Sequence, residues 1–197
     1  NGMPICLGYL AVSFTLGITA RNAGMTAWQA MLTSLACNAS AGQYAGFTVI
    51  AAGGTYFEMV LMELVANARY LLMSCSLSQK FSSETGLLHR LLVGFDVTDE
   101  IFGVAVSEPG KLNPFYNYGM MTVAIPGWSL GTFFGVIMGN ILPANIVSAL
   151  SVGLYGMFLA IIIPPARKNK VIAALVTISM VSSYIFSRLP VISDISS

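Results

Sequence analysis

Residues 57–77 read FEMVLMELVANARYLLMSCSL, and this stretch decides the class of fold. It has about the twenty apolar residues needed to cross a bilayer, yet Glu63, Asn67 and Arg69 interrupt it. A soluble helix could turn these groups to water, but the flanking residues leave hardly any polar face. The stretch therefore indicates a membrane helix that holds its polar groups inside protein or beside a water-filled path.

The composition of the whole chain also indicates a membrane protein. Of its 197 residues 56% are hydrophobic and only 9% are charged, with a mean hydropathy of +0.78. That is too little charge to cover the surface of a soluble domain of this length. Segments that cross lipid must be helical, because no water is present there to satisfy open backbone groups. We therefore predict an all-α fold, a polytopic membrane helical bundle.

Seven hydrophobic segments follow one another, separated by short connectors rich in Gly, Pro, Asn and charge. They are Met3–Ala20, Ala27–Ala52, Phe57–Leu77, Leu87–Val106, Phe115–Leu142, Ile146–Ile163 and Val171–Phe186. We expect one transmembrane domain over residues 1–197, incomplete at one or both ends, since the chain starts without Met and stops at SDISS.

The second segment contains SLACNASAGQYAGF, residues 34–47, with Asn38, Ser40 and Gln43 close to its middle. Small and polar residues can serve as helix-packing contacts. Alternatively the helix breaks here and exposes backbone ends to a solute, as in transporters with discontinuous helices. We predict the break, and we expect these three residues to bind substrate together with Asn67 and Arg69.

Arg69 has two possible roles. Its guanidinium can bind a substrate carboxylate through two parallel hydrogen bonds. It can also pair with an acid on a neighbouring helix and hold the bundle together. The two roles are compatible with each other.

The fourth segment, LLHRLLVGFDVTDEIFGVAV, raises a problem of orientation. Lys80 and Arg90 bracket its start, whereas Arg167, Lys168 and Lys170 form a cluster between segments six and seven. If segments four, five and six all cross, these basic groups lie on opposite sides, which the positive-inside rule disfavours. We therefore expect segment four to be re-entrant or to lie partly in the membrane interface.

The same segment carries three acids on one helix face, Asp96, Asp99 and Glu100. Three carboxylates so close together cannot all ionise cheaply in a medium of low dielectric constant, so we expect at least one to hold a proton. Asp99 and Glu100, together with Glu63, are the candidate proton-coupling residues. Asp96 is interpreted as structural.

The fifth segment contains GWSLGTFFGVIMG, in which a glycine recurs at every fourth position. Such a repeat forms a smooth groove for the close approach of another backbone, and it favours helix packing over solute contact. The partner helix could belong to this chain or to another subunit. The glycines are Gly127, Gly131, Gly135 and Gly139, and Pro126 before them suggests a kink.

Several functional classes find no support in the sequence. One histidine and three cysteines inside apolar segments do not give the spacing of a metal site. No phosphate loop, dinucleotide fingerprint or basic tract for nucleic acid is present. GWS at 127–129 has only the distant His89 as a base for a nucleophile, so an intramembrane protease is not expected. We expect no enzyme, no cofactor, no metal and no nucleic acid.

Five stretches together resemble the AzlC family, the large subunits of azaleucine-resistance, branched-chain amino acid exporters. They are GQYAGF (42–47), NARYLLMS (67–74), VTDEIFG (97–103), the glycine repeat, and LYGMFLAIIIP (154–164). The chain departs from the family at Tyr70, where members usually have His. Family chains also continue into one more apolar segment after the Leu189–Pro190 pair.

The resemblance implies a transporter domain for secondary active export of leucine, valine and isoleucine, with methionine as a further candidate. It also implies a small AzlD-type membrane subunit as partner and a multi-pass location in the bacterial cytoplasmic (inner) membrane. Proton antiport is expected because the sequence has no nucleotide-binding motif and carries acids within apolar segments. Two alternatives stay open: a non-transporting scaffold subunit, and uptake in place of export.

Overall fold

The computed structural model of the chain describes residues 2–139, 141, 145, 163, 166–167 and 169–186. Every regular element within them is an α-helix. The chain divides into two compact units, residues 1–154 and 155–197, and each is described by itself. The predicted sixth segment, Ile146–Ile163, lies outside the described residues except at its last position.

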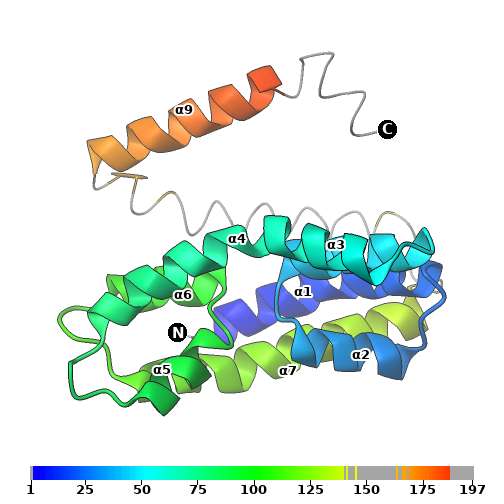
Figure 1. Ribbon diagram of the computed structural model, residues 1–197, viewed down its shortest axis with the longest axis horizontal. Helices are drawn as coiled ribbons and strands as arrows, with labels where there is room; N and C mark the ends of the chain where they lie inside the picture. The colour runs from blue at the N-terminus through cyan, green and yellow to red at the C-terminus, as the bar shows by residue number, and fades with distance from the viewer. Residues whose placement is uncertain are drawn as a thin grey trace. The chain divides into compact units, whose positions relative to one another are not determined.

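The centre of the first unit is the pair formed by α1 (Gly2–Asn22) and α7 (Pro114–Met138), which pack along one another (Figure 1). The ring of Tyr9 on α1 meets the ring of Trp128 on α7 edge to face, with centroids 5.2 Å apart. Both side chains are buried, so the core of this unit is built around the two helices.

The glycine repeat lies on the face of α7 that touches α1. A Cβ atom added at Gly127 would lie 2.7 Å from Cys6 Sγ, and one added at Gly135 would lie 2.9 Å from Gly17 Cα. Real Cβ atoms essentially never lie this close to another heavy atom. At these positions α7 is therefore so close to α1 that only the hydrogen atom of a glycine fits between them. The helix that lies against these glycines is α1 of the same chain.

The predicted second segment consists of two helices, α2 (Ala27–Ala36) and α3 (Ser40–Ala51). The backbone is extended at Cys37 and at Ala39, which separate them. The two helices have different neighbours, since α2 lies along α7 whereas α3 lies against α4 and α1 (Figure 1). The chain thus changes partner helices at residues 37–39.

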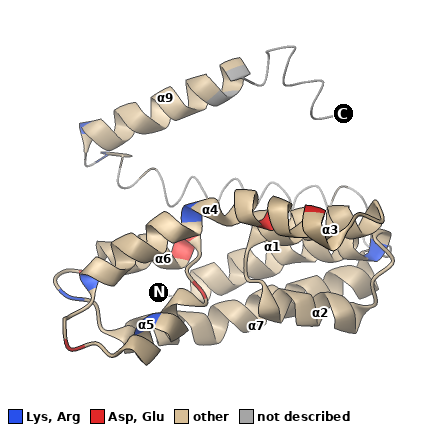
Figure 2. Ribbon diagram, in the orientation of Figure 1, with Lys and Arg blue, Asp and Glu red and all other residues tan. Residues whose placement is uncertain are grey.

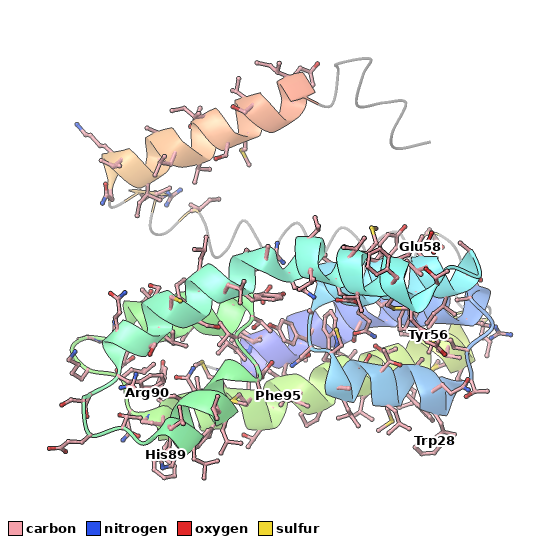
Figure 3. The ribbon with its side chains drawn as sticks, viewed as in Figure 1. Trp28, Tyr56, Glu58, His89, Arg90 and Phe95 are labelled. Carbon is pink, nitrogen blue, oxygen red and sulfur yellow. The ribbon has the colours of Figure 1, made fainter. Side chains whose placement is uncertain are left out.

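The stretch of sequence quoted first, residues 57–77, lies in α4 (Tyr56–Lys80). It begins with a capping box: Thr55 Oγ1 accepts from the backbone N–H of Glu58, and Glu58 Oε2 accepts from the N–H of Thr55 at 2.6 Å. Glu58 and Tyr56 are labelled at this end of the helix in Figure 3. Among the residues that the structure describes, little of α4 is buried, and Leu77 is its one fully buried residue.

The predicted fourth segment consists of α5 (Leu87–Gly94) and α6 (Asp99–Ser107). At about 1.5 Å per residue each is far shorter than a bilayer. The residues that follow α4 lie beside the residues that precede α7. Phe81 forms a β-bridge with Leu112, and the Leu112 N–H donates to Lys80 O at 2.9 Å. The ammonium of Lys80 also donates to the carbonyls of Val106 and Glu108. This course fits a re-entrant segment, which stays a prediction.

Three of the described helices, α1, α4 and α7, are long and apolar enough to cross a membrane. In the second unit, α9 (Lys170–Phe186) is a shorter apolar helix. Figure 2 shows mostly uncharged ribbon, with charged residues at helix ends and on α4 where it passes α3 and α6. The prediction of an all-helical membrane protein is confirmed, while the number of seven segments stays a prediction.

Candidate functional site

The break between α2 and α3 contacts the break between α5 and α6 inside the first unit. Asn38, between α2 and α3, donates from Nδ2 to Oδ1 of Asp96, which lies between α5 and α6. The side chain of Asp96 is 1% exposed. We call this contact, between residues 58 positions apart in the chain, the break junction.

The start of α6 is fixed to α1 next to the break junction. Thr98 is the N-cap of α6, and its hydroxyl accepts from the N–H of Ile101. The phenol of Tyr9 donates to Glu100 Oε2 at 2.6 Å and shares a hydrogen bond with the hydroxyl of Thr98. Glu100 is 6% exposed, so its carboxylate is held by a neutral donor inside protein.

An accessible ion pair joins α4 to α6. Arg69 Nη2 lies 3.0 Å from Asp99 Oδ2, and the two side chains are 44% and 27% exposed. The guanidinium carbon of Arg69 also lies 5.2 Å from the centroid of the Tyr70 ring. A guanidinium has five N–H donors, so this pair leaves donors of Arg69 free to bind a second carboxylate.

Glu63 and Asn67 lie under α3. Asn67 Nδ2 donates to Glu63 Oε2 at 2.7 Å. A Cβ atom at Gly42 would lie 2.5 Å from Asn67 Nδ2, and one at Gly46 would lie 3.1 Å from Glu63 Oε1. The two glycines therefore let the backbone of α3 rest on the polar stripe of α4.

Gln43 belongs to a closed ring of hydrogen bonds. Trp128 Nε1 donates to Gln43 Oε1 at 2.8 Å, and Gln43 Nε2 donates to Ser34 Oγ. Ser34 in turn donates to Thr132 Oγ1 at 2.7 Å, and Thr132 donates to the carbonyl of Trp128 at 3.2 Å. The ring ties α2, α3 and α7 together, and every donor in it has an acceptor.

The structure therefore distributes the predicted substrate-binding residues over neighbouring places. Asn38 lies at the break junction, and Ser40 is half-buried in the first turn of α3. Asn67 and Arg69 lie on α4, the former beneath α3 and the latter paired with α6. The hydrogen bonds of Gln43 run to α2 and α7, and none runs to α4.

Several polar residues at these contacts were not predicted as site residues from the sequence. Tyr9 and Trp128 supply donors, yet an aromatic residue in an apolar helix gives no signal by its spacing. Asn117 and Ser129 on α7 are fully buried, and their side-chain polar atoms have no partner within the described part of the chain. For Asn117 and Ser129, the one signal in the sequence was a polar residue within an apolar run.

A surface hollow of about 520 Å³ lies elsewhere, where α1 passes into α2. Its lining contains no charged residue and none of the predicted site residues; it consists of Ala23, Gly24, Met25, Gln29, Leu32, Thr33 and Ile50. Among the residues that the structure describes, no three His, Cys, Asp or Glu side chains gather closely enough to hold a metal ion. The polar contacts between α3, α4 and α6 are thus the candidate site.

Comparison with known proteins gives one family. The family model described as AzlC protein matches residues 4–142. A protein of Archaeoglobus fulgidus named "Uncharacterized membrane protein" is 30% identical over 173 residues, which are 87% of this chain and 75% of that protein. The inner membrane protein YgaZ of Escherichia coli K12 is 26% identical over 144 residues, which are 71% of this chain and 59% of YgaZ. No solved structure matches.

Proposed function

Because the chain belongs to the AzlC family, we propose that it is a secondary transporter that exports leucine, valine, isoleucine and related hydrophobic amino acids. The observation that carries the proposal is the accessible ion pair of Arg69 and Asp99, next to the break junction in an otherwise apolar bundle. Ionisable groups within membrane segments usually mark a solute path. A pair of opposite charges fits a solute that itself carries both charges.

An amino acid offers one carboxylate and one ammonium group. The free donors of Arg69 can take the carboxylate through a bidentate contact, and Asp99 can take the ammonium. α3 begins at Ser40 without a side-chain cap, so the positive end of its backbone dipole adds to the attraction for a carboxylate. The ion pair then opens around the substrate and closes again when it leaves.

The side chain of the substrate needs an apolar surface. Val65 and Leu72 lie four residues before and three residues after Arg69, which places them on the same face of α4. Both are exposed within the described part of the chain. An apolar surface beside a few polar groups is the usual lining of a site for a small amphipathic ligand, and it suits a branched side chain.

Flux of labelled leucine in proteoliposomes tests the proposal. Arg69→Lys keeps the charge but removes the fork, and it should lower flux about tenfold or more, since a hydrogen bond to a charged group contributes roughly 1.5–3 kcal/mol. Arg167→Lys, at an exposed arginine, is the matched control and should transport normally. Normal flux in Arg69→Lys would remove the carboxylate contact from the proposal.

The direction of transport is tested in cells. If the protein exports, a strain that lacks it should be more sensitive to leucine-rich dipeptides than its parent, because intracellular leucine cannot leave. A transporter that takes up leucine would give no such sensitivity. Equal growth of the two strains would argue against export.

We expect a small AzlD-type subunit as the partner. The support from the structure is α4, which is little buried among the described residues and whose Arg69 side chain is 44% exposed. A charged group facing lipid is costly, so a protein partner on this side would lower the cost. Co-purification from native membranes tests this, and a chain recovered alone and fully active would contradict an obligatory partner. A stable complex without leucine flux would favour the scaffold alternative.

Proton exchange is the proposed energy source, with Asp99, Glu100 and Glu63 as candidate coupling residues. Each is a carboxylate in an apolar setting, and no nucleotide-binding motif is present in the sequence. The test is leucine flux driven by a pH gradient in purified Asp99→Asn and Glu100→Gln proteins that still bind leucine. Unchanged dependence on the gradient in both would exclude these two residues from the coupling.

A further inference from the structure

Asp96 differs from the other acids of the site in how its oxygens are satisfied. Asp99 is paired with a guanidinium, Glu100 accepts from a phenol, and Glu63 accepts from the amide of Asn67. Asp96 is the most deeply buried of them, and its Oδ2 has no hydrogen-bond partner. A buried carboxylate oxygen without a donor is costly when the group is ionised.

The second unpartnered atom lies on the other side of the same contact. Asn38 Nδ2 donates to Asp96 Oδ1, while Asn38 Oδ1 and Asp96 Oδ2 are both buried and both lack partners. An ionised carboxylate only accepts, and an amide oxygen only accepts. The break junction therefore has two acceptors on neighbouring groups and no donor for either.

One hydrogen atom satisfies both of them. A protonated carboxyl has one O–H donor, and an acid next to a primary amide can form two antiparallel hydrogen bonds, N–H to O and O–H to O. We propose that Asp96 is a proton-binding site, with the proton on Oδ2 donated to Asn38 Oδ1 so that a closed acid–amide ring joins the two helix breaks. The proton comes from water, and no other bond is made or broken.

The charged and titratable neighbours of Asp96 agree with this assignment. The α6 neighbour Glu100 is acidic and interacts unfavourably with an ionised Asp96, and the phenol of Tyr9 on α1 is neutral. On α4, Arg69 is paired with Asp99 and Glu63 accepts from its own helix. Within the described residues no basic side chain lies within ion-pair distance of Asp96.

The ring gives the proton a mechanical effect. With the proton present, two hydrogen bonds connect the α2–α3 break to the α5–α6 break. Without it, the hydrogen bond from Asn38 Nδ2 to Asp96 Oδ1 is the one that remains, and the connection is weakened. Its use for coupling rests on the proposed function, since only in a proton-driven transporter would uptake and release of this proton be linked to the movement of a solute.

Infrared difference spectroscopy of the purified protein in detergent tests the protonation directly. At neutral pH the wild-type protein should show the carbonyl stretch of a neutral carboxylic acid, and Asp96→Asn should lose this band. An asparagine at this position can form the same ring as an amide pair, so the variant should fold. The matched control is Glu84→Gln, at an exposed acid that is not part of the candidate site, which should keep the band. A wild-type band that Asp96→Asn leaves unchanged would overturn the proposal.

A residue swap adds a second measurement. The double variant Asn38→Asp with Asp96→Asn exchanges the acid and the amide, so the neutral-acid band lost in Asp96→Asn should reappear. The melting temperature of the swap should lie above that of Asn38→Asp alone, which places two carboxyls together. Absence of the band from a folded swap, or a swap no more stable than Asn38→Asp, would contradict the ring.

A bound metal cation is the competing way to satisfy the two oxygens. If sodium bound there in place of the proton, the wild-type protein would have a higher melting temperature in sodium buffer than in choline buffer, and Asp96→Asn would not. That result would overturn the proposal. A melting temperature that is the same in both salts supports the proton. None of these measurements uses flux, so a failure of leucine transport would refute the proposed function and leave the proton site standing.

Discussion

Replacement of Gly131 by alanine tests the contact between α1 and α7, on which the first unit is built. A Cβ atom at this position would lie 2.5 Å from the carbonyl oxygen of Leu10 and 3.0 Å from its Cα. A carbon–oxygen contact normally needs about 3.3–3.6 Å, so the backbone of Leu10 would have to retreat by about 1 Å. Backbone in the middle of a helix cannot move aside alone, and the two helices must separate.

The matched control lies on the same helix. Gly119 is in α7, and a Cβ atom added there meets nothing within 4 Å. Each Gly→Ala change gains about 1 kcal/mol of helix propensity, and this gain cancels when the two variants are compared. Overpacking costs about 1–3 kcal/mol, so Gly131→Ala should be less stable than Gly119→Ala by that amount.

The assay is thermal unfolding of both variants in the same detergent, followed as the fraction that remains folded and monodisperse after heating. Gly131→Ala should unfold at a lower temperature than Gly119→Ala and no higher than the wild-type protein, and Gly119→Ala should unfold at the wild-type temperature or higher. Equal stability of the two variants would refute the reasoning, because it would mean that α1 does not lie against this face of α7.

Three further changes have defined outcomes. Trp128→Phe leaves Gln43 Oε1 without its donor and should lower the free energy of unfolding by about 1–3 kcal/mol, measured by the same heating assay; an unchanged value would contradict the hydrogen-bond ring. Tyr9→Phe removes the donor from Glu100 Oε2, so the loss of stability should be larger at alkaline than at acid pH, and a loss independent of pH would contradict it. Arg90→Leu removes three donors from carbonyls at the end of α4 and the loop that follows, and proteolysis there should become faster than in the wild-type protein; an equal rate would contradict this role.

The class of fold and the family could be predicted from the sequence because both depend on local features. An apolar stretch such as Phe57–Leu77 must be helical in lipid whatever surrounds it. The AzlC resemblance rested on short stretches of neighbouring residues, and it is confirmed. Such features need no knowledge of which helices lie side by side.

The starts of two helices also have a signal in the sequence. Thr26 is followed three residues later by Gln29, and Thr55 is followed three residues later by Glu58. Both pairs have the spacing of a capping box, and in the structure both capping boxes are formed at the starts of α2 and α4. The signal fixes where these helices begin, but not what they pack against.

The contacts of the candidate site could not be predicted in the same way because their partners are distant in the chain. Tyr9 and Glu100 are 91 residues apart, and Gln43 and Trp128 are 85 residues apart. The sequence shows a polar residue that needs a partner, but many helix arrangements could supply one. Arg69 was the exception in part, because an unpaired guanidinium in an apolar bundle is so costly that an acid on a neighbouring helix was an expected partner. In the structure that acid is Asp99.

The hydrogen-bond ring through Gln43 and the break junction differ in how easily the helices they join can separate. In the ring through Gln43 every donor has an acceptor, so separating α2, α3 and α7 would break several hydrogen bonds at once where no water can replace them. At the break junction, an ionised Asp96 leaves one hydrogen bond and two acceptors without donors. Separating α5 and α6 from the α2–α3 break therefore costs less than separating α2 from α7. Local opening occurs where fewest interactions are lost, so the break junction with an ionised Asp96 is better placed to open around a solute than the ring through Gln43.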